Sequence, residues 1–103
     1  MKYDVKDIDS LSYEASEGAL KLKYKVLMES LYFSPGINLR EEGGKVYLDI
    51  VRCRIDDKCA VDFDAEYDDE GASLVTLSTD ASVDDMYVSG AKESALLNTL
   101  IRE

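Results

Sequence analysis

Residues 59–79, CAVDFDAEYDDEGASLVTLST, decide the fold. In the first half of this stretch apolar and acidic residues alternate: Val61, Phe63, Ala65 and Tyr67 are separated by Asp62, Asp64, Glu66 and Asp68. A period of two is typical of a β-strand that buries one face. We therefore expect a strand over 59–67 whose exposed face carries the four carboxylates Asp62, Asp64, Glu66 and Asp68, here called the acidic row.

A turn follows at Asp69, Glu70 and Gly71, because a type I turn closed by a left-handed glycine needs three loop residues with glycine last. Counting outward from this turn pairs Tyr67 with Ser73, Ala65 with Val75 and Phe63 with Leu77. Directly paired residues share a face, so the apolar residues of both strands meet. The sequence thus predicts a hairpin of strands 59–67 and 72–79.

Upstream, residues 46–55 follow a Gly43-Gly44 turn and predict a further strand that pairs with 59–67. Two registers are open. In the first, Cys53 faces Cys59 and Asp49 lies opposite Phe63. In the second, a two-residue turn at Asp56-Asp57 pairs Ile50 with Phe63 and separates the cysteines. A bulge near Arg52-Cys53 would satisfy both patterns.

The N-terminal segment also alternates. Leu11, Tyr13 and Ala15 predict an early strand, and Glu17-Gly18 a turn. The next segment has two faces: Leu20, Leu22, Tyr24, Val26 and Met28 lie on one, and Lys21, Lys23 and Lys25 on the other. Helical spacing fits part of 20–33, but a helix would put Leu22 and Val26 on the wrong face, so a strand is preferred.

The pattern changes near the C-terminus. Residues 86–88 predict a short strand, and Ser89 is a suitable N-cap for a terminal helix. Four residues would form the apolar stripe of that helix: Leu96, Leu97, Leu100 and Ile101. The expected fold class is mainly β or α+β, an antiparallel sheet or β-sandwich with a C-terminal helix, in one domain over 1–103.

Charge and composition exclude several classes of function. The chain carries 22 acidic and 12 basic residues, a net charge of −10, and the excess lies entirely after residue 40. Such a charge disfavours nucleic acid and anionic membranes, and it favours capture of a basic protein. Histidine is absent, which removes imidazole-based catalysis and the commonest transition-metal ligand. No glycine-rich phosphate loop occurs.

Two cysteines, Cys53 and Cys59, are too few for a zinc site without histidine and too far apart for a thioredoxin-type motif. A disulfide and two reduced, partly buried thiols are both open alternatives. The acidic row fails the EF-hand pattern, which leaves an irregular cation site at Asp68, Asp69 and Glu70 as an alternative. Lys21, Lys23 and Lys25 would instead neutralise the row if the two strands are neighbours.

Asp49 is the carboxylate to examine for catalysis. In the first register it would lie among Tyr47, Val51 and Phe63, where desolvation raises the pKa of a carboxyl group. The simpler interpretation is that Asp49 points to water.

We expect a non-enzymatic β domain without cofactor that acts through protein–protein interaction, with the acidic row facing a basic partner. A divalent-cation or small-ligand domain is the first alternative, and a carboxylate-based enzyme the second. No signal peptide opens the chain as given. A cytoplasmic protein is expected if Met1 is the native start, and an exported one if a signal peptide has been removed.

Overall fold

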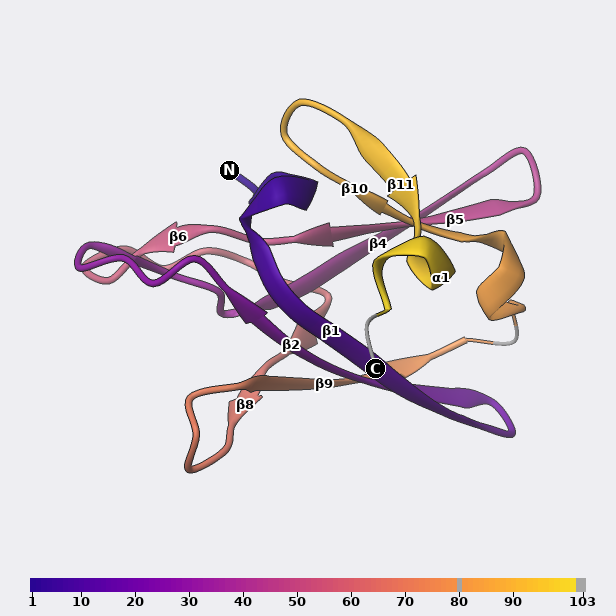
Figure 1. The fold of residues 1–103 in the computed structure, drawn as a ribbon, viewed down its shortest axis with the longest axis horizontal. Coiled ribbons are helices and arrows are strands. Elements are labelled where there is room, and N and C mark those ends of the chain that lie inside the picture. Colours follow the sequence, from indigo (N-terminus) through magenta and orange to yellow (C-terminus); the bar gives the residue numbers. More distant parts are fainter. Residues whose placement is uncertain (80, 102–103) are drawn as a thin grey trace.

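Two β-sheets pack face to face in the computed structural model, which describes residues 1–79 and 81–101 (Figure 1). One sheet has the strand order β1-β2-β9-β8 and the other β11-β10-β5-β4-β7, while β3 and β6 form a separate two-stranded ribbon. The strands are β1 (Ile8–Ser16), β2 (Ala19–Val26), β3 (Tyr32–Phe33), β4 (Gly36–Glu42), β5 (Lys45–Ile50), β6 (Cys53–Arg54), β7 (Phe63–Asp64), β8 (Glu66–Tyr67), β9 (Ser73–Ser78), β10 (Met86–Ser89) and β11 (Ser94–Leu96). The helices are η1 (Val5–Asp7), η2 (Val83–Asp85) and α1 (Leu97–Leu100). The expected fold class is confirmed.

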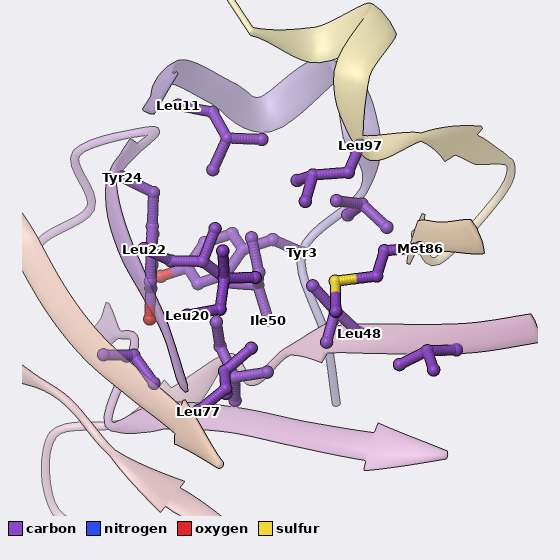
Figure 2. Close-up of a cluster of buried hydrophobic side chains, with 14 residues drawn as sticks. Tyr3, Leu11, Leu20, Leu22, Tyr24, Leu48, Ile50, Leu77, Met86 and Leu97 are labelled. Atoms are coloured by element: carbon purple, nitrogen blue, oxygen red, sulfur yellow. The ribbon is translucent and has the colours of Figure 1, made fainter. Parts of the chain in front are cut away.

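The core lies between the two sheets and takes side chains from both (Figure 2). Leu20, Leu22 and Tyr24 of β2 point inward together with Leu77 of β9, and they meet Leu48 of β5 from the opposite sheet. Every second residue of these strands is buried, as a sheet with one solvated face requires. The alternation in the sequence therefore selected the correct buried face.

The first hairpin agrees with the sequence. β1 and β2 pair with Ser16 opposite Ala19, so Glu17-Gly18 forms the predicted two-residue turn, and Gly18 has a φ of 71°. The segment after residue 19 is a strand as far as Val26 and not a helix. The lysines of β2 face outward, on the side away from the core.

The hairpin predicted around Gly71 is present only next to its turn. Gly71 has a φ of 82°, and the N–H of Asp68 donates to the carbonyl of Ala72 over 3.0 Å. Tyr67 lies opposite Ser73, as expected. The turn chemistry was therefore correct, and the error concerns the strand that leads into it.

Strand 59–67 breaks at Ala65 instead of continuing along β9. β7 joins the other sheet, where Phe63 lies opposite Ile37 of β4, so the predicted pairing of Phe63 with Leu77 is wrong. The Ala65 N–H donates to the carbonyl of Pro35 over 2.9 Å. By crossing between the sheets, the segment supplies hydrogen-bond partners to both open edges, which a continuous strand could not do.

The partner expected for β5 was also wrong. β5 pairs antiparallel with β4 across Gly43-Gly44 and parallel with β10, and neither predicted register with 59–67 occurs. Both glycines have positive φ, 57° and 80°, which a two-residue hairpin of this handedness requires. The turn at these glycines was predicted, but the strand before it, β4, was not, and the apolar match to 59–67 indicated the wrong neighbour for β5.

The C-terminal helix is real but shorter than expected. Ser89 ends β10 instead of capping a helix, and residues 94–96 form β11 opposite β10. A tight loop joins the two strands, with the Gly90 N–H donating to the carbonyl of Glu93 over 2.8 Å. Between residue 89 and residue 101, where the described part of the chain ends, α1 alone is helical, and its Leu97 is completely buried. Tertiary pairing here overrides helix propensity.

Candidate interaction surfaces

The acidic row lies along one side of the sandwich and not on the face of one strand. Asp62 and Asp64 belong to the segment that pairs with β4, whereas Glu66 and Asp68 belong to the segment that pairs with β9. β7 and β8 are the edge strands of the two sheets. The row therefore passes from the edge of one sheet to the edge of the other.

Two carboxylates of the row are engaged within the fold. Asp62 accepts the N–H of Leu39 over 2.9 Å, which satisfies a main-chain donor of β4 beyond the end of β7. Asp68 accepts the N–H groups of Ala72 and Glu70, each over 2.9 Å, and lies 3.3 Å from the ammonium of Lys23. The Ala72 N–H in particular holds the pKa of Asp68 below its ordinary value.

The other two carboxylates, Asp64 and Glu66, face solvent. Within the described part of the chain neither forms an ion pair or a side-chain hydrogen bond. Of the three lysines on β2, Lys23 contacts the row, through Asp68. The free negative charge of the row is thus concentrated on Asp64 and Glu66.

The arrangement around Asp68, Asp69 and Glu70 does not resemble a cation site. Asp69 and Glu70 are exposed, and both oxygens of Asp68 already have partners in the turn or on Lys23. Among residues 1–79 and 81–101, no three acidic or cysteine side chains gather closely enough to hold a metal ion.

Asp49 is held in a polar network instead of pointing freely to water. Its two oxygens lie 3.2 Å from the ammonium of Lys2 and 3.4 Å from Nε of Arg40. Both cations also donate to the hydroxyl of Ser89, over 2.9 Å and 3.0 Å. The carboxylate is neutralised by two cations on the outer face of the sheet. It lies opposite Asn38 rather than Phe63, so the register that would desolvate it is wrong.

Comparison with known protein families, curated proteins and solved structures finds no match to this chain. None of the helices in the described residues is long and apolar enough to cross a membrane.

Cys53 and Cys59 lie at disulfide distance, with sulfur atoms 2.07 Å and Cα atoms 6.1 Å apart. The geometry arises differently from either predicted register, because Cys53 belongs to the β3–β6 ribbon, opposite Phe33. Cys53 is buried and Cys59 is exposed. The pair closes the loop that carries residues 54–58.

Next to this loop lies an apolar surface that the sequence analysis missed. Four exposed apolar side chains form it, and we call them the ribbon end: Leu27, Met28, Leu31 and Ile55. Their exposed fractions are 49%, 94%, 54% and 61%. The sequence did contain a signal: beyond the buried residues of β2, Leu27 and Met28 end one apolar run and Leu31 begins the next.

An open groove of about 700 Å³ lies beside the Gly43-Gly44 turn. Its wall includes Glu41, Glu42 and Lys45. These three side chains are all exposed.

Proposed function

We propose that this protein is a non-enzymatic β-sandwich domain that binds a basic protein through its acidic row. The observation that carries the proposal is the exposure of Asp64 and Glu66, on the edge strands of two different sheets, without a cation beside either in the described structure. Their charge is available to a partner, whereas Asp62 and Asp68 already serve the fold.

The net charge of −10 supports capture of a basic partner. Long-range attraction raises the association rate, and salt screens it over about 8 Å at physiological ionic strength. A competing explanation of the same charges is protection of the sheet edges, since charged side chains prevent edge strands from pairing with other chains. The experiment must therefore locate the binding site of a cationic probe and not only detect its binding.

The test uses hexalysine as the basic probe and follows backbone amide NMR signals during titration at low salt. We expect the largest shifts at residues 62–70. The Asp64→Asn, Glu66→Gln variant should keep its stability within about 0.5 kcal/mol, because both side chains are exposed. It should bind the probe several-fold more weakly than the wild-type protein.

The matched control is Asp9→Asn, Glu14→Gln, which removes the same charge from β1 at the opposite edge of the four-stranded sheet. This variant should retain most of the affinity and the same pattern of shifts. Equal weakening by both variants, or shifts spread evenly over the surface, would reduce the effect to net charge and contradict a recognition surface at the acidic row.

A further inference from the structure

We propose that the ribbon end binds a second copy of this chain, in a two-fold symmetric contact. The first observation is the concentration of exposed apolar side chains on two adjacent loops. The N–H of Ile55 donates to the carbonyl of Leu31 over 2.9 Å, so these side chains come from neighbouring backbones. In Figure 1 the loops before β3 and after β6 project together from one end of the sandwich. Large apolar side chains exposed on neighbouring loops mark contact sites.

The ribbon end is also held in shape before any partner arrives. The guanidinium of Arg52 donates to Glu29 through Nε and Nη2, with the Nε–Oε1 distance at 2.8 Å, and it lies 3.8 Å from the centre of the Tyr32 ring. This pairing holds the pKa of Glu29 below its ordinary value. The Cys53–Cys59 pair closes the neighbouring loop. A preformed surface loses little conformational entropy on binding.

The charges around Ile55 favour an identical partner. The charges of the exposed loop residues Arg54, Asp56, Asp57 and Lys58 sum to zero, with a cation at each end of this segment and two carboxylates between them. In a two-fold contact the same surface of both copies forms the interface. If a cation of the first copy faces a carboxylate of the second, the same cation of the second copy faces the same carboxylate of the first. Arg54 pairs with Asp56 of its own copy, with Nε and Oδ1 3.1 Å apart, and Lys58 of one copy can face Asp57 of the other.

The rest of the surface argues against other occupants. A basic partner is attracted to the excess acid elsewhere on the molecule and gains nothing at a neutral end. Two copies repel each other through their net charge of −10, and this repulsion is smallest when they meet at a surface whose charges sum to zero. The dimer should consequently strengthen as salt increases, whereas the binding of a basic protein weakens.

Sedimentation velocity over a range of protein concentrations tests the proposal, at about 0.02 M and about 0.5 M sodium chloride. We expect a monomer–dimer equilibrium that shifts toward dimer at the higher salt. Ile55→Ser should lower the association constant about tenfold or more, because a two-fold contact loses the buried side chain twice. Met28→Ser should act in the same direction. Both side chains are exposed, so both variants should unfold at the wild-type temperature.

The matched control is Leu74→Ser. Leu74 is an apolar residue of β9 that is 36% exposed on the outer face of the four-stranded sheet. This substitution should leave the association constant unchanged. A protein that stays monomeric at every concentration and both salts would overturn the proposal. So would a dimer that is insensitive to Ile55→Ser and Met28→Ser, or one that is lost in Leu74→Ser.

Discussion

The crossing of 59–67 from one sheet to the other can be tested with a single methyl group, by Gly36→Ala. Gly36 lies in β4 directly opposite Asp64, and a Cβ placed on it would be 2.1 Å from the main-chain oxygen of Phe63. Real Cβ atoms do not approach another atom to less than 3.0 Å. The contact is with backbone, so rotation of a side chain cannot relieve it. β7 must move away from β4.

The cost follows from what this movement breaks. Overpacking of a closed site costs about 1–3 kcal/mol, and each main-chain hydrogen bond lost costs about 1 kcal/mol. The bond at risk is that from the Ala65 N–H to the carbonyl of Pro35. We therefore expect Gly36→Ala to lower the free energy of unfolding by about 2–4 kcal/mol, a large part of the 5–15 kcal/mol typical of a domain.

Urea denaturation followed by circular dichroism measures this loss, and amide hydrogen exchange at Ala65 locates it. If Phe63 instead lay opposite Leu77, as predicted from the sequence, Gly36→Ala would raise the free energy of unfolding. In that arrangement Gly36 has no close neighbour on 59–67, and alanine in a strand is more stable than glycine by about 0.5–1 kcal/mol. A variant as stable as the wild-type protein, or more stable, would refute the crossing.

Three further predictions concern other parts of the fold. Gly71→Val should destabilise the protein by about 1 kcal/mol or more, because Gly71 has a φ of 82° that a β-branched residue resists; an unchanged urea midpoint would contradict the turn. An air-oxidised sample, once unfolded, should show no reactive thiol, and two thiols on quantitative labelling would exclude the bridge. Reduction of the Cys53–Cys59 pair should lower the free energy of unfolding by about 2 kcal/mol, because the unfolded chain gains loop entropy. Burial raises the pKa of Tyr3 and of Tyr24 to about 12, so the folded state favours the neutral phenols and stability should fall as the pH rises from about 10 through 12. Tyr24→Phe should make this decline shallower, and phenolate absorbance that shows all seven tyrosines titrating together near pH 10 would contradict the burial.

Local patterns predicted those elements whose partners are adjacent in the chain. The alternation of leucine and lysine in β2 and the Glu17-Gly18 turn specify a hairpin without reference to the rest of the protein. The Gly71 turn is equally local, because its hydrogen bonds join residues at most four positions apart. In each case the sequence contains both sides of the interaction within a few residues.

The wrong predictions concern segments whose structure depends on a residue far away in the sequence. The helix expected from Ser89 is replaced by a strand pair because the buried carboxylate of Asp4 accepts the N–H groups of Lys92 and Glu93, at 2.9 Å and 3.2 Å. These N–H donors hold the pKa of Asp4 below its ordinary value. Neither the helix propensity nor the hydrophobic periodicity of residues 89–96 indicates that Asp4, more than eighty positions away, binds this segment.

The acidic row shows why a charge pattern alone could not distinguish carboxylates that bind within the fold from carboxylates that are free on the surface. Asp62 and Asp64 occupy equivalent places in the alternation, yet Asp62 accepts the Leu39 N–H and Asp64 faces solvent. The difference arises because β7 begins only at Phe63, so the N–H of Leu39 in β4 has no main-chain partner in β7 and binds the side chain of Asp62 instead. Neutralising Asp62 therefore removes a charged acceptor from the sheet edge, whereas neutralising Asp64 removes only surface charge. A variant designed from the sequence, which changes both, would mix these two effects. The Asp64→Asn, Glu66→Gln pair isolates the charge that remains available for recognition.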